Sequence, residues 1–263
     1  MRRVIRWTLL WTVLPLALAV CDAGSEPVSV VLPVEADGSG LSACTTAEGY
    51  VVELTECRVA LRDLEFTVGG EIHARLPDAL RRLLLPAPAA AHPGHYAGGE
   101  VTGELPGSFV LDAFAGAARL LGDATLLEGE YHGANFHFRA ADADDGLPAG
   151  DELLGHTAVL AGTATRGTDT WTFRAVLDVE DGTQLVGAPL DLTVTPRTTA
   201  TLVLRLLATD PSTEVDTLFD GIDFAALDAD GDRRVTILPG DEAHNRLRRT
   251  LQVHDHWWVD VRE

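Results

Sequence analysis

The sequence predicts a mainly β protein, an antiparallel β-sandwich followed by a short C-terminal appendage with a helix and an acidic loop. Three observations lead to this fold class. Many short segments are rich in valine, threonine and aromatic residues, apolar and polar residues often alternate within them, and glycine, proline and aspartate punctuate the gaps. Such a pattern is typical of an antiparallel sandwich or an open barrel. We expect residues 28–209 to form a sandwich and residues 210–263 the appendage.

The expected strands follow one another with short connections. Residues 170–179 show the alternation well, because Trp171 and Phe173 fall on one face of an extended chain while Thr172 and Arg174 fall on the other. We expect strands within residues 28–36, 50–68, 107–115, 125–140, 156–166, 170–179, 183–196 and 199–209.

Two segments favour helices. Residues 77–85 begin at a proline and end before another, as helices often do. Residues 241–254 open at an aspartate that is suited to cap a helix, and Leu247, Leu251 and His254 then form one apolar stripe.

The N-terminus has the pattern of an export signal. Three arginines among the first six residues precede an apolar run to Val20, which is too short for a membrane-spanning helix of about 20 residues. Residues 18–21 (LAVC) resemble the lipobox of bacterial lipoproteins, although Val20 stands where a smaller residue is usual. The resemblance implies a signal peptide over residues 1–20, lipidation of Cys21, a tether over residues 21–27, and membrane attachment in the cell envelope, periplasmic or at the cell surface. An A-x-A cleavage site before Val20 is the alternative.

The chain has three cysteines. In an oxidising compartment Cys44 and Cys57 can form a disulfide, which leaves Cys21 over for the lipid. Closing a loop of this length stabilises a fold by about 3 kcal/mol.

The formal net charge of −20 argues against nucleic acid as a partner, because binding phosphate requires positive charge. The acidity is compatible with binding cations, and equally with keeping an exported protein soluble. The kind of protein partner is not indicated.

The most specific local motif is LDADGDRRVTI, residues 227–237. Asp228, Asp230 and Asp232 alternate, so a backbone coiled around a cation would bring three carboxylates together, and calcium prefers such oxygens. The segment resembles the first half of an EF-hand loop, which implies the carbonyl of Arg234 as a further ligand. Arg233 departs from the glycine of the sixth position and Pro239 from the glutamate of the twelfth, where Asp241 and Glu242 are possible substitutes. The alternative is an aspartate-rich turn that binds nothing.

The nine histidines include three pairs close in sequence. His92 and His95 flank a Pro-Gly turn, and with His132 they are our preferred site for copper or zinc, metals that imidazole binds well. Secondary candidates are His137, His254 and His256. No named metal signature contains these spacings, so solvated histidines are the alternative.

Three functions therefore compete. The first is an exported, lipid-anchored metal-binding protein with copper or zinc at histidines and calcium at the acidic loop. The second is a non-catalytic envelope or surface interaction module. The third is a hydrolase that uses paired carboxylates among residues 141–146 and 151–152, which we consider the weakest because no nucleophile or nucleotide-binding motif accompanies them.

Overall fold

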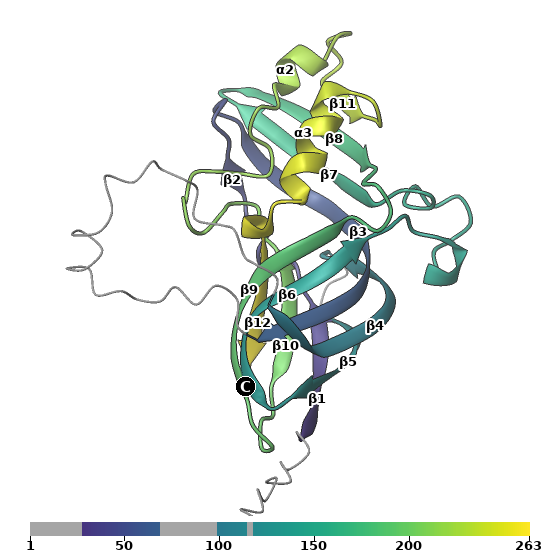
Figure 1. Ribbon diagram of the computed structural model, residues 1–263. Coiled ribbons are helices and arrows are strands. Elements are labelled where there is room, and N and C mark those ends of the chain that lie inside the picture. Colours follow the sequence, from purple (N-terminus) through teal and green to yellow (C-terminus); the bar gives the residue numbers. More distant parts are fainter. Residues whose placement is uncertain (1–27, 69–98, 115–117) are drawn as a thin grey trace, which may run out of the picture.

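The structure is a computed structural model that describes residues 28–68, 99–114 and 118–263 (Figure 1). The predicted signal peptide, Cys21, the helix expected over residues 77–85, and both His92 and His95 lie outside the described residues. None of the described helices combines the length and the apolar character that crossing a membrane requires.

The prediction of a mainly β fold is confirmed. The strands are β1 (Ser29–Ala36), β2 (Cys44–Thr45), β3 (Val51–Val68), β4 (Glu100–Asp112), β5 (Arg119–Leu127), β6 (Gly129–Phe138), β7 (Ala158–Arg166), β8 (Asp169–Leu177), β9 (Gln184–Val194), β10 (Thr201–Leu206), β11 (Arg234–Ile237) and β12 (Trp257–Arg262). The helices are α2 (Phe224–Leu227) and α3 (Glu242–Leu251), and the 3-10 turns are η1 (Ala143–Asp145) and η2 (His254–His256).

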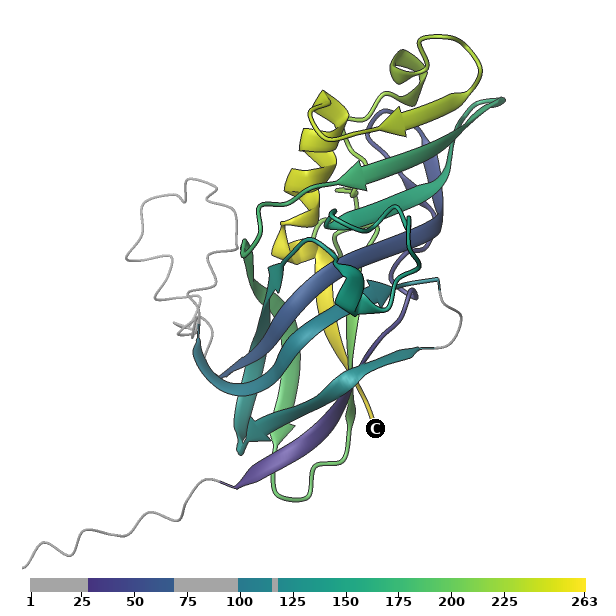
Figure 2. The same cartoon turned by 90° about the vertical axis from the view of Figure 1, so that its right-hand side faces the viewer.

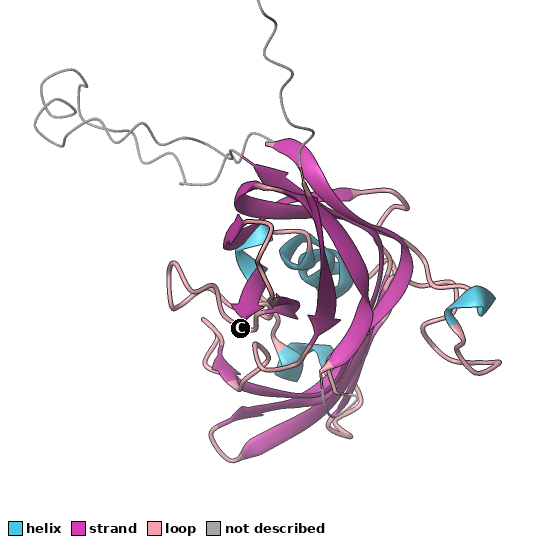
Figure 3. Ribbon diagram, turned by 90° about the horizontal axis from the view of Figure 1, so that it is seen from below, coloured by secondary structure: helices cyan, strands magenta, loops and turns pink. Residues whose placement is uncertain are grey.

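A two-sheet sandwich is not confirmed, because the described strands belong to one branched, mixed sheet. Its main path runs β11-β8-β7-β3-β4-β5-β1-β10-β12, while β2 and β6 pair with β3 and β9 pairs with β6. Most pairs are antiparallel, but β1–β10 and β8–β11 are parallel. The sheet curls strongly when it is viewed from below (Figure 3), and the curl brings β9 beside β12 without a hydrogen-bonded ladder between them.

Strand β3 is the spine of this sheet. One of its edges pairs with β7 over Val51–Val59 and then with β6 over Leu61–Val68, while the other edge pairs with β2 and then with β4. Register shifts near Thr55 and Asp63 mark where the strand bends, and Asp63 has a left-handed φ of 50°. One strand thus joins two groups of strands that bury apolar residues against a continuous core.

The core contains two clusters of aromatic side chains. Trp257 is fully buried, its ring centroid lies 4.8 Å from that of Phe136, and its indole N–H donates to the Leu251 carbonyl at 2.8 Å. Tyr50 packs edge-on against Trp171 and Phe224 in the other cluster.

Residues 210–263, which we expected to form an appendage, are built into this sheet. Strand β11 pairs with β8, β12 pairs with β10, and α3 buries Leu247 and Leu251 in the core. Helix α3 ends at Leu251, three residues before the predicted end, and His254 begins η2 instead. The strand expected over residues 125–140 is split at Glu128 into β5 and β6.

The predicted disulfide is not formed, because Cys44 and Cys57 are both buried free thiols. Cys44 lies opposite Val52 of β3, and Cys57 is five residues farther along that strand. At about 3.3 Å per residue, these five residues span roughly 16 Å. A disulfide needs Cα atoms within about 7 Å. Burial raises the pKa of Cys44 to about 11 and raises that of Cys57 further, so both thiols are protonated at neutral pH.

Substitutions of the adjacent residues Trp257 and Trp258 test which of the two side chains lies in the core. Replacing Trp257 with alanine removes a fully buried ring and its hydrogen bond, so we expect the free energy of unfolding to fall by about 3–5 kcal/mol. Trp258→Ala is the matched comparison, because this side chain is 37% exposed and its truncation should cost less, about 1 kcal/mol. Chemical denaturation measures both variants, and equal losses would contradict the placement of these two rings.

Candidate metal centre

Three aspartates converge in the connection between α2 and β11. One carboxylate oxygen from each of Asp228, Asp230 and Asp232 lies within 4.8 Å of the others. Asp228 is half-buried, and the other two are exposed. The sequence-based expectation that these carboxylates converge is therefore met by the geometry of the loop.

The loop coils because two of its residues adopt left-handed backbone conformations. Gly231 has a φ of 76°, which costs glycine little, but Arg233 has a φ of 64°. A residue with a Cβ pays about 1–2 kcal/mol for this conformation. Arg233 is the position where an EF-hand loop normally has glycine, so the loop keeps the turn although the residue that favours it is absent.

Backbone hydrogen bonds to the carboxylates hold the coil. The Arg233 N–H donates to Asp228 at 3.2 Å, and the Arg234 N–H donates to Asp232 at 2.8 Å. The Arg233 carbonyl accepts from the N–H of Thr172 in β8 at 2.9 Å. Because carbonyls alternate in direction along a strand, the Arg234 carbonyl faces away from β8, as a further oxygen ligand would have to.

The rigid end of the sheet positions the first aspartate. The Trp171 indole N–H of β8 donates to Asp228 Oδ2 at 3.0 Å, and β11 continues the loop as a parallel neighbour of β8. Asp228 also ends α2, whose N-cap, Asp223, accepts a hydrogen bond of 2.5 Å from the Tyr50 hydroxyl. That hydrogen bond lowers the pKa of Asp223, and burial raises the pKa of Tyr50.

The arginines of the loop do not neutralise this group. Arg233 pairs with Asp169, the first residue of β8, at 2.6 Å instead of with the three aspartates. Three carboxylates at this spacing repel one another, and a bound cation would relieve the repulsion.

The two acids proposed to complete the loop are engaged elsewhere. Asp241 accepts from the Leu238 N–H at 2.8 Å, and Glu242 pairs with Arg246 of α3 at 3.2 Å. Neither belongs to the converging group, so the described loop brings three carboxylates together, and the Arg234 carbonyl stays a further ligand that the EF-hand resemblance implies.

Comparisons of this chain with protein-family models, with curated proteins and with solved structures found no match.

The structure does not assemble a histidine site among the described residues. His132 is exposed on β6, and its predicted companions, His92 and His95, lie outside the described residues. In the part of the chain that is described, the aspartate group is the only set of three metal-ligating side chains close enough to share an ion. The copper or zinc site therefore stays a prediction.

The secondary histidine candidates lie on two different elements, β6 and η2. His137 lies on β6 between Arg62 and Gln184 in the ladders, and it is half-buried. His254 and His256 share η2 rather than an extended face. His256 is buried with Nδ1 3.1 Å from the Leu207 carbonyl oxygen, and its burial lowers its pKa.

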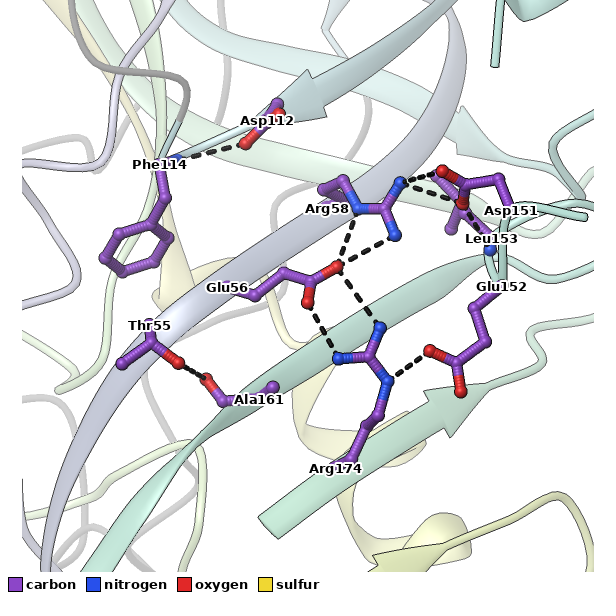
Figure 4. Close-up of polar contacts among 10 residues, drawn as sticks. All are labelled: Thr55, Glu56, Arg58, Asp112, Phe114, Asp151, Glu152, Leu153, Ala161 and Arg174. Carbon is purple, nitrogen blue, oxygen red and sulfur yellow. Dashed lines mark hydrogen bonds and ion pairs between the residues drawn. The ribbon is translucent and has the colours of Figure 1, made fainter. Parts of the chain in front are cut away.

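A network of ion pairs on the outer face of β3, β7 and β8 was not predicted from the sequence (Figure 4). Glu56 of β3 accepts from Arg58 at 2.9 Å and from Arg174 of β8 at 2.8 Å. Arg58 also donates to both carboxylate oxygens of Asp151 at 2.8 Å, and Arg174 donates to Glu152. The network fastens the segment between β6 and β7 to the sheet. The only sequence signal was the polar face of each strand, which does not say which charges meet.

This network bears on the paired-carboxylate hypothesis. Asp151 and Glu152 are bound to arginines, and the hydrogen bond from Arg58 lowers the pKa of Asp151. A general acid in glycoside cleavage needs a raised pKa, so the arrangement gives no support to that chemistry.

The lowered pKa of Asp151 predicts a pH-dependent contribution to stability. Its carboxylate stabilises the fold above the unfolded pKa of about 3.9, and this stabilisation is lost as the pH falls through the lower folded pKa. Asp151→Asn should therefore cost about 1–3 kcal/mol at pH 7 and progressively less below pH 4. Denaturation at several pH values measures the difference.

Asp181→Asn is the matched control, since that side chain is 70% exposed and lies 4.0 Å from Arg62. We expect its effect to stay below about 0.5 kcal/mol. A cost of Asp151→Asn that persists at pH 2.5 would show that the ion pair is not its source.

Proposed function

We propose that this chain is an exported, lipid-anchored protein of the bacterial cell envelope that binds one calcium ion at the loop from Asp228 to Arg234. The convergence of the three carboxylates carries the proposal. The N-terminal pattern that ends at Cys21 supports export and anchoring.

The donor set favours calcium over other metals. Carboxylate and carbonyl oxygens are hard ligands, which suit calcium, magnesium and manganese better than copper or zinc. Calcium accepts six to eight oxygens in an irregular arrangement, whereas magnesium demands a near-octahedral one. A coiled loop with two exposed carboxylates and room for water fits the more tolerant ion.

The expected affinity is low. Four protein oxygens and the lack of a bidentate glutamate at Pro239 place the loop nearest to extracellular calcium modules, with dissociation constants of about 10⁻⁴–10⁻³ M. An exported protein meets calcium at such concentrations more readily than one in the cytosol.

The bound ion would have a structural consequence. It would fasten the end of α2 to the start of β11, while the indole of Trp171 already ties Asp228 to β8. The repulsion among three carboxylates would become attraction to a shared cation. The proposed role is therefore a calcium-dependent stiffening of this end of the sheet.

Calcium titration tests the proposal. We expect calcium to raise the midpoint of thermal unfolding, because a ligand at ten times its dissociation constant stabilises the fold by about 1.4 kcal/mol. For a chain of this size that corresponds to about 3–5 °C. Terbium, which replaces calcium in oxygen sites, should luminesce on excitation of tryptophan, since the Trp171 nitrogen lies 3.0 Å from Asp228.

Asp230→Asn combined with Asp232→Asn should abolish both signals. The matched control is Glu130→Gln with Asp191→Asn, which removes the same charge from exposed positions on β6 and β9. Equal calcium responses in the two double variants, or no response of the wild type to 10 mM calcium, which is about tenfold above the weakest dissociation constant expected, would overturn the proposal.

A further inference from the structure

Neighbouring strands β4 and β5 leave a gap in the sheet. They pair only through Gly103 with Leu126 and Glu104 with Thr125. Beyond these pairs, β4 runs on to Asp112 with β3 on its other edge, and β1 is the one partner of β5 among the described residues. The two strands diverge from each other (Figure 2), so two edges without a ladder face each other across the gap.

Local sequence builds this divergence. Gly107 has a φ of 111° and donates its N–H to Asp63, at the register shift between β3 and β4. Gly122 of β5 lies at the register shift against β1, and a Cβ there would come within 2.8 Å of the Leu105 side chain. Both strands bend at glycines and bulges, so the divergence of β4 from β5 follows from their own backbone conformations.

The alternation of an antiparallel ladder shows which backbone groups face the gap. The Ala113 N–H donates to the Cys57 carbonyl of β3 at 3.0 Å. Residues an odd number of positions away, Ser108, Val110 and Asp112, therefore direct their N–H and C=O groups away from β3 and toward the gap. Such edges are the usual template for the addition of a strand.

The gap is hollow, and its surroundings are acidic and partly apolar. A hollow of about 310 Å³ lies between Ser108–Val110 of β4 and Arg119–Leu121 of β5, beside η1. Asp142 and Asp144 border it with exposed carboxylates. Leu120 is 58% exposed on its rim. Three aspartates and Arg119 line the hollow, and the buried Arg139 pairs with Asp145 and lies 3.9 Å from Asp142. The described walls therefore keep a small excess of negative charge.

We propose that this gap is a docking groove for an extended, basic segment of a partner protein, which adds as a strand between β4 and β5. The free backbone edges would supply hydrogen bonds, and the apolar groups would accept alternate side chains. The acidic border selects for lysine or arginine. A second copy of this chain fits poorly as occupant, since each copy has a formal charge of −20.

The test uses a library of fluorescent octapeptides, acetylated and amidated, in which lysine alternates with valine, threonine, isoleucine or phenylalanine. We expect saturable binding of the best peptides to the full-length chain. The same peptides with glutamate in place of lysine, or with N-methylated backbone at alternate positions, should bind at least tenfold more weakly. If no lysine peptide binds, or if N-methylation has no effect, the proposal is wrong.

Two kinds of variant locate the binding. Asp142→Asn with Asp144→Asn should weaken the lysine peptide about three- to tenfold at 0.1 M salt, whereas Glu130→Gln with Asp191→Asn should not. Ser108→Pro removes an edge N–H and should abolish binding, while Ser108→Ala, which keeps it, should bind normally. Thermal unfolding checks that each variant is folded.

If both double variants bind the peptide equally, the groove is not the site. Sedimentation would reveal the competing occupant: a dimer of this chain that Ser108→Pro dissociates would replace the basic partner with a second copy and overturn the proposal.

Discussion

The backbone hydrogen bonds of β3 are the constraint on which the rest of the structure depends. This single strand of 18 residues forms ladders with β2, β4, β6 and β7. It changes partner on both edges, and it also bends along its length. The bulges at Thr55 and Asp63 provide the bends. The aspartate loop at one end and the gap between β4 and β5 at the other are therefore both positioned through β3.

The fold could be predicted as far as local patterns reach. Alternation marks most strands, and the stripe of Leu247 and Leu251 marks α3. The pairing of strands is not local, so the sequence did not indicate that β11 and β12 join the sheet or that β3 has four partners. The disulfide prediction failed for the same reason. Cys44 and Cys57 are only thirteen positions apart in the chain, which made a disulfide look feasible. Strand pairing places Cys44 opposite Val52, and the five residues from Val52 to Cys57 run along an extended strand, so the two sulfur atoms are too far apart to bond.

The candidate site was more accessible to sequence reasoning, because its ligands are close neighbours in the chain. Alternating aspartates predict a loop that brings their carboxylates together, and this prediction needs no knowledge of the surrounding structure. Arg233 adopts the left-handed conformation that an EF-hand-like loop requires at its sixth position. What the pattern omits is the support from elsewhere in the chain: the Trp171 hydrogen bond to Asp228 and the pairing of Arg233 with Asp169. The ion pairs around Glu56 and the gap beside β4 likewise arise from residues distant in sequence.

Native-state hydrogen exchange of the β3 amides tests most directly whether this strand unites the molecule. The account predicts that amides on both sides of Thr55 exchange only through global unfolding, with the same free energy within about 1 kcal/mol, and that β7 and β8 share this value. If β7, β8 and the first half of β3 instead opened together several kcal/mol below the second half, the two ends of the sheet would be independent units and β3 would not be their common support.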